Sequence, residues 1–319
     1  MNNVVEKVVA GDVRTAARLI RDIDDELPGT REILKALHPH MVRAYVIGIT
    51  GAPGVGKSTL VDQMIHHLRE RGKTVGVLAV DPTSPFSGGA ILGDRIRMQR
   101  HCMDDGVFIR SLATRGHFGG LTQSTRSAID VLDAMGKDYI IVETVGVGQD
   151  EIDIVKSAHT TIVVVIPGMG DDVQAVKAGI LEAGDIFLIN KSDREGAHKT
   201  LADLKMMIDI NQSKYDGGEW RPPVLMAEAV CDQGVVELLE EIGNHEQHIN
   251  AMSEDLKIRE KADIVRTALI EMIKSRLLKE ILKPMTDSVE FERAVDSIVD
   301  GTRDPYSACD ELAFPCTRP

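Results

Sequence analysis

The stretch Gly51-Ala52-Pro53-Gly54-Val55-Gly56-Lys57-Ser58 decides the fold of this chain, because it matches the pattern G-x-x-x-x-G-K-[ST] at every position. An apolar run of strand length, 45–50, precedes it, and Thr59 follows it in a segment with apolar residues at helical spacing. A strand, a glycine-rich loop and a helix N-terminus together form a phosphate cradle, because backbone N–H groups converge and the helix dipole favours negative charge. In such a cradle Lys57 reaches the β- and γ-phosphates and Ser58 holds Mg²⁺. The stretch therefore predicts a P-loop nucleotide-binding protein.

The overall composition of the 319 residues is that of an ordinary globular protein, with 43% hydrophobic residues and a mean hydropathy of −0.08. A net charge of −13 and an aromatic content of 3% argue against nucleic-acid binding, which needs basic surfaces and rings for base stacking. No apolar run approaches the roughly 20 residues that span a bilayer, and the N-terminus shows no export signal. The four cysteines are widely separated, which is typical of a reduced protein. We expect a cytoplasmic protein that binds neither nucleic acid nor a membrane.

Acidic residues follow two of the expected strands. The run 75–80 is followed by Asp81, and the run 139–142 by Glu143. At the carboxyl end of a parallel strand an acid lies near the phosphates and can bind Mg²⁺, although Asp81 by itself fits a turn or helix cap equally well. The long Pro/Gly/Ser-rich segment 81–98 favours a functional loop over a connector, and it adds Asp94 as a further candidate metal ligand.

The segment Glu143-Thr144-Val145-Gly146-Val147-Gly148-Gln149 has the features of a Walker B strand end. Glu143 is expected to order Mg²⁺-bound water, and the N–H of Gly146 to contact the γ-phosphate. The position after that glycine, which holds the water-positioning glutamine in Ras-like GTPases, is Val147 here. Gln149 is a candidate substitute two residues further on. The apolar Val147 predicts slow intrinsic hydrolysis.

A second recognition motif, Asn190-Lys191-Ser192-Asp193, follows the apolar run 185–189. It matches N-K-x-D, in which the carboxylate accepts both the N1–H and the exocyclic N–H of guanine, a pairing that adenine does not offer. Asn190 and Lys191 brace the loop. After a further strand, 223–226, the backbone N–H of Ala229 is a candidate donor to the guanine oxygen. The base is therefore predicted to be guanine.

The regions outside this core read as helical. We divide the chain into a helical N-terminal extension (1–44), a P-loop domain of seven strands (45–250) and a helical C-terminal segment (251–319). Within the last segment, Lys283-Pro284-Met285 is expected to break a helix that runs from 235 to 282.

Two pairs of histidines are candidate metal ligands but favour plain surface positions. His38 and His40 flank a proline in an expected turn, and His245 and His248 lie three apart on an expected helix. No neighbouring carboxylate or thiol cluster accompanies either pair, so a solvated surface is the favoured interpretation.

The segment 81–98, together with 143–149 and 190–193, resembles the accessory GTPases of adenosylcobalamin-dependent acyl-CoA mutases, and the resemblance extends over nearly the whole chain. It implies an α/β fold with a mostly parallel P-loop sheet, and a C-terminal arm that forms a homodimer. It places the nucleotide and Mg²⁺ positions on Lys57, Ser58, Asp81, Asp94 and Glu143. A third switch, 168–177, would relay the nucleotide state to the mutase, with Lys177 supplying charge to the phosphates or lying in solvent. One departure is Glu228-Ala229 in place of Ser-Ala in the guanine loop, which a backbone contact tolerates.

The function that this resemblance implies is that of a chaperone which binds GTP or GDP with Mg²⁺. It would gate delivery of adenosylcobalamin to the mutase and help release damaged cofactor. The chain has no D-x-H-x-x-G motif, so the cobalamin is expected to belong to the partner. Two alternatives are a metallochaperone GTPase for nickel enzymes, which would favour a His-rich tract or C-x-x-C, and a small-molecule kinase or transport ATPase, against which N-K-x-D speaks.

Overall fold

The structure is a computed structural model that describes residues 2–81, 98–101, 103–113, 120–144, 158–168, 184–210, 219–252, 262, 265–267, 269–270, 272–274 and 276–313. The chain divides into two compact units, Met1–Glu260 and Lys261–Pro319. In the first unit lies one seven-stranded sheet in the order β3-β2-β4-β1-β5-β6-β7, and every neighbouring pair is parallel. The strands are β1 Tyr45–Thr50, β2 Val75–Asp81, β3 Val107–Ala113, β4 Tyr139–Thr144, β5 Thr160–Val165, β6 Ile186–Ile189 and β7 Val224–Met226. The predicted seven-stranded parallel α/β fold is confirmed.

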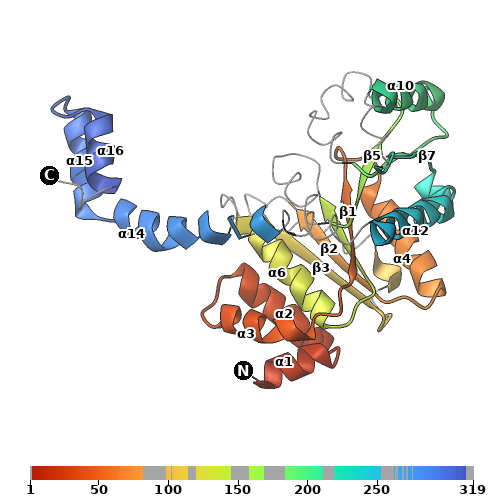
Figure 1. The fold of residues 1–319 in the computed structure, drawn as a ribbon, viewed down its shortest axis with the longest axis horizontal. Coiled ribbons are helices and arrows are strands. Elements are labelled where there is room, and N and C mark those ends of the chain that lie inside the picture. The colour runs from red at the N-terminus through yellow and green to blue at the C-terminus, as the bar shows by residue number, and fades with distance from the viewer. Residues whose placement is uncertain are drawn as a thin grey trace. The chain divides into compact units, whose positions relative to one another are not determined.

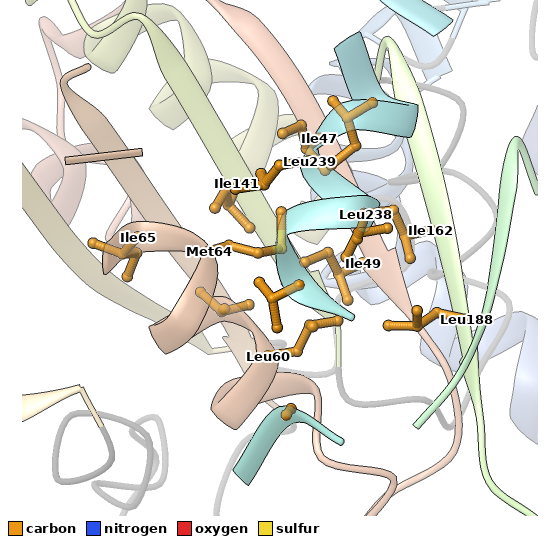
Figure 2. Close-up of a cluster of buried hydrophobic side chains, with 14 of the residues drawn as sticks. Ile47, Ile49, Leu60, Met64, Ile65, Ile141, Ile162, Leu188, Leu238 and Leu239 are labelled. Atoms are coloured by element: carbon orange, nitrogen blue, oxygen red, sulfur yellow. The ribbon is translucent and has the colours of Figure 1, made fainter. Parts of the chain in front are cut away.

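Helices cover both faces of this sheet, which explains why its strands are apolar almost without interruption. On one face lie α4 (Lys57–Glu70) and α12 (Val235–Ala251), as Figure 1 shows. Figure 2 shows their side chains meeting those of the central strands, with Met64 of α4 close to Leu238 and Leu239 of α12. Ile47 and Ile49 of β1 contribute to the same cluster and are fully buried. This packing fixes the helix that begins at the P-loop against the middle of the sheet.

The opposite face is covered by α6 (Gly120–Ala134) and by the N-terminal helices α1 (Asn2–Val9), α2 (Val13–Asp24) and α3 (Thr30–Leu37). Asp12 caps α2, because its Oδ1 accepts a hydrogen bond from the backbone N–H of Thr15 at 2.6 Å. A single apolar cluster joins these helices to β2, β3 and β4. Towards the β6–β7 edge of the same sheet, α10 (Ala197–Ile210) packs through Leu204 and Ile208.

The second unit differs from the sequence prediction at Pro284. Residues Leu278–Leu282 form a π-helical turn, η4, which continues directly into α14 (Lys283–Thr286), so the predicted break at Pro284 is wrong. The N–H of Lys283 bonds to the carbonyl of Leu278, five residues back. This wider turn gives the proline ring room beside the preceding carbonyls, which an ordinary α-helical turn does not. The helices α15 (Val289–Val299) and α16 (Pro305–Ala313) follow.

No helix among the residues that the structure describes is both long enough and apolar enough to cross a membrane.

Candidate functional site

The candidate site is a pocket of about 680 Å³ at the carboxyl ends of the central strands. It combines the P-loop, the ends of β2 and β4, the loop after β6 and the loop after β7. This is the edge at which parallel α/β sheets bind their ligands. The pocket is lined by Pro53, Gly54, Gly56, Lys57, Ser58, Thr59, Val80, Glu143, Thr144, Asn190, Lys191, Asp193, Arg194, Glu228, Ala229 and Val230.

Two glycines of the P-loop are required by the packing around them. Gly51 has φ +144°, and a Cβ there would lie 2.1 Å from the carbonyl oxygen of Val164 in β5. Gly56 has φ +97°, and its Cβ would lie 2.4 Å from Nδ2 of Asn190. Both positions combine a left-handed or extended positive φ with a contact that no side chain permits. The loop can therefore wrap closely against β5 and against the Asn190 loop only because these residues are glycines.

Lys57 begins α4 and is 6% exposed. Its Nζ donates to the carbonyl oxygens of Gly51 (2.6 Å) and Ala52 (3.1 Å), so the ammonium is held inside the loop. A buried cation at a helix N-terminus, surrounded by glycine backbone, is an arrangement that favours an anionic ligand.

Ser58 and Glu143 meet between the P-loop helix and β4. The Ser58 hydroxyl donates to Glu143 Oε1 at 2.7 Å, and both residues are buried. A hydroxyl and a carboxylate oxygen are the hard ligands that Mg²⁺ prefers. Because the pair lines the pocket beside the phosphate cradle, its donor set fits a magnesium ion.

The loop after β6 is braced against the P-loop. Asn190 Nδ2 donates to the carbonyl of Val55 at 2.7 Å, and Lys191 Nζ donates to the carbonyl of Gly54 at 2.7 Å. Asn190 Oδ1 in turn accepts the backbone N–H of Ala229 at 3.1 Å. The amide that the sequence suggested as a donor to guanine is therefore engaged by Asn190 here. Asn190 links the P-loop to the loop after β7.

Several candidate residues lie outside the described residues: Asp94, Gly146, Gln149 and Lys177. Asp81 forms the last residue of β2, paired with Ala113 of β3. Gly51, Ala52 and Val55 belong to the P-loop but do not line the pocket. Sequence reasoning missed Val80, Thr144, Arg194 and Val230 as lining residues, although each directly adjoins a residue that it had singled out.

The histidine pairs have different surroundings. His38 and His40 are exposed in a short 3₁₀ turn, as predicted. The predicted solvated position of His245 is wrong: it is 5% exposed, its Nδ1 lies 2.8 Å from Thr160 Oγ1, and the Trp220 ring lies 4.7 Å away. Burial lowers the pKa of His245 to about 4. Within the part of the chain that the structure describes, no group of three or more His, Cys, Asp or Glu residues is arranged to hold a metal ion.

Together, the sheet order and this pocket define a P-loop nucleotide hydrolase. A sequence profile described as methylmalonyl Co-A mutase-associated GTPase MeaB matches residues 16–286. The chain belongs to this family, and it is a GTPase that binds guanine nucleotide.

Relatives over most of the chain agree with this assignment. A Pyrococcus horikoshii protein named as a GTPase is 46% identical over 311 residues, which cover 97% of this chain and 96% of its own length. The GTPase ArgK of Escherichia coli is 32% identical, covering 91% and 87% respectively. A mouse protein named methylmalonic aciduria type A homolog, mitochondrial, is 34% identical over 65% of this chain and 50% of its own length. The crystal structure of a LAO/AO transport system kinase has a TM-score of 0.68 at 24% identity, covering 99% of this chain and 97% of its own length, and supports the fold alone.

Proposed function

We propose that this GTPase is a chaperone of an adenosylcobalamin-dependent acyl-CoA mutase, and that its nucleotide state gates cofactor delivery and the release of damaged cofactor. The observation that carries the proposal is the match of residues 16–286 to the mutase-associated family, over the stretch that builds the braced pocket. The name of the mouse relative, methylmalonic aciduria type A homolog, supports the same link to methylmalonyl-CoA metabolism. A metallochaperone role remains the alternative outcome.

Different residues of the pocket would bind different parts of the nucleotide. Lys57 and the P-loop backbone would hold the phosphates, and Asp193 at the pocket rim would read guanine. Asn190 and Lys191 hold the two loops together through the contacts described above. The amide of Ala229, which donates to Asn190 Oδ1 at 3.1 Å here, would exchange that acceptor for the guanine oxygen when the base enters.

Mg²⁺ would be held by Ser58 and Glu143, with Asp81 and Asp94 as further ligands. When bound, the ion would offset the negative charge of the phosphates and position them for attack by water. Gln149 and Lys177 are our candidates for orienting that water and for stabilising the developing charge. The segment 168–177 would carry the nucleotide state to the mutase.

A homodimer is proposed from the second unit. Among the described residues between 265 and 281, large apolar side chains are exposed to solvent in the single chain and recur every four residues, namely Val265, Leu269, Ile273, Leu277 and Ile281. An apolar stripe of this kind on a helix is typical of an interaction surface. A second copy of the chain would cover it.

The test is single-turnover GTP hydrolysis with and without a purified adenosylcobalamin-dependent acyl-CoA mutase, beside mutase binding in the GTP and GDP states. We expect slow hydrolysis by the chain alone, on the order of 10⁻³–10⁻² s⁻¹, and faster turnover with the mutase. If the two nucleotide states bind the mutase differently, the mutase must shift nucleotide affinity by the same factor. A mutase that neither stimulates hydrolysis nor distinguishes the states would contradict the chaperone role and leave the GTPase assignment intact.

A further inference from the structure

A contact far from the phosphates joins the P-loop helix to the loop after β7. His67 lies near the C-terminal end of α4, and its Nε2 is 2.8 Å and 3.0 Å from the two carboxylate oxygens of Asp232. The side chain of His67 is 15% exposed and that of Asp232 36% exposed. The Nδ1 atom of the same ring faces Glu70 at 3.4 Å. The pair is thus a partly exposed contact of one ring nitrogen with two carboxylate oxygens, between segments 165 residues apart in sequence.

Asp232 lies two residues after Val230, the last residue of the loop after β7 that lines the pocket. It ends the 3₁₀ turn η3 (Ala229–Cys231) in a left-handed conformation, with φ 57°, which aspartate adopts more readily than most residues other than glycine. Two backbone hydrogen bonds between Glu228 and Gln233, at 3.0 Å and 3.2 Å, close the loop around it. A contact that restrains the Asp232 side chain therefore also restrains the position of this compact loop. Other residues of the loop line the pocket, namely Glu228, Ala229 and Val230.

The contacts form a closed ring around the base side of the pocket. From the P-loop, Val55 bonds to Asn190, which bonds to Ala229. Three residues after Ala229, Asp232 bonds to His67, and α4 returns the chain to the P-loop at Lys57. Apolar packing of α4 against the sheet, with Met64 fully buried one turn before His67, holds the helix side of the ring in place.

We propose that His67 is a positioning residue for guanine recognition: by holding Asp232, it fixes the loop after β7 so that the Ala229 amide and its neighbours meet the base. The inference rests on the guanine pocket of the proposed function. Ala229 stays packed in the apolar cluster that includes α4, so loss of the pair should loosen the loop rather than detach it. Affinity for the base should fall, while the phosphate cradle, built by residues 51–58, keeps its own contacts. His67 itself does not touch the nucleotide.

The experiment compares His67→Ala with the unmodified full-length protein. We expect the Kd for GDP, measured by calorimetry, to rise about fivefold, because GDP binding must then also order the loop after β7. Tripolyphosphate, which carries no base, should compete for the P-loop with an unchanged Kd. The neighbouring His66→Ala is the control for a change beside the pair. The His66 ring lies 5.3 Å from that of His67 and also faces Glu70, at 3.5 Å, but its described ion pair does not include Asp232 and its side chain is 43% exposed. His67→Gln, which retains a donor, should restore most of the GDP affinity.

A second variant, Asp232→Asn, tests whether the effect on GDP affinity comes from positioning of the loop or from a general loss of protein stability. If the pair acts as one unit, the double variant His67→Ala/Asp232→Asn should be no weaker for GDP than the worse single variant. Equal losses of GDP and tripolyphosphate affinity, or GDP affinity unchanged in both single variants, would overturn the inference. If the unmodified protein bound ATP as tightly as GTP, the guanine pocket itself would be refuted, which is a distinguishable result.

Discussion

Asp193 carries the base specificity that we propose. It lies exposed at the pocket rim, two residues after Lys191 of the braced pair Asn190–Lys191. We expect Asp193→Asn to weaken GTP binding and to raise affinity for xanthosine triphosphate, because an amide donates to the 2-oxo group that replaces the guanine amine. The loss for GTP should be about 1.5–3 kcal/mol, roughly ten- to a hundredfold in Kd. Calorimetric titration with both nucleotides measures it, and unchanged GTP affinity would contradict the role of Asp193.

Glu143 is the described carboxylate that contacts Ser58, at 2.7 Å. The isosteric change Glu143→Gln should lower GTP turnover and its dependence on Mg²⁺, and should affect GDP affinity less, because the carboxylate acts through the metal and the γ-phosphate. Lys57→Ala should abolish hydrolysis. Single-turnover assays over a series of Mg²⁺ concentrations are the measurement, with thermal unfolding as the control for folding. Normal turnover with normal Mg²⁺ dependence in Glu143→Gln would make this residue structural.

At the scale of elements, α12 is tied to the sheet through a buried histidine. His245 bonds to Thr160 at the start of β5 and packs on Trp220. Burial, reinforced by nearby His248 and His159, lowers the pKa of His245 to about 4. The folded protein holds the ring neutral, whereas the unfolded chain takes up a proton near pH 6.5. This residue should therefore cost the folded state stability as the pH falls from about 6.5 towards 4, by up to about 3 kcal/mol.

The measurement is urea unfolding at pH 7.5, 6 and 5, followed by the fluorescence of the lone tryptophan, Trp220, which contacts the His245 ring. His245→Asn keeps a polar atom near Thr160 but does not titrate, so its unfolding free energy should fall less on acidification. The comparison between the two proteins is needed because burial raises the pKa of Asp130 to about 6, which acts in the opposite direction. Equal pH slopes would show that His245 is not held neutral.

At the scale of the whole molecule, the apolar stripe of the second unit predicts the assembly. We expect the unmodified protein to sediment at twice the 34.9 kDa of one chain. Ile273→Glu, at a position 49% exposed in the single chain, should produce monomers without unfolding the protein. The matched control is Ile210→Glu in α10, where the side chain is 73% exposed. A monomeric unmodified protein, or a dimer that survives Ile273→Glu, would refute pairing through this stripe.

The sequence by itself determined the P-loop, all seven strands and the guanine motif after the sixth, because these are local signals. The strands are indicated by seven short apolar runs, and the loops by glycines and by acids at strand ends. Each of these signals depends only on residues that are close in sequence. Family membership followed from the same motifs taken in order. Gly51 and Gly56 both have positive φ angles, which explains why the P-loop pattern requires glycine at these two positions.

Only the tertiary structure decided which distant segments meet. It placed β4 between β1 and β2, brought Asn190 against Val55 across 135 residues, and brought His67 to Asp232 across 165. It buried His245, which helical spacing alone assigned to the surface, because Trp220 and β5 cover that side of α12. It also carried a helix through Pro284 by widening one turn. Such outcomes depend on packing between segments that are far apart in sequence. A periodic pattern within one segment does not indicate which other segment packs against it.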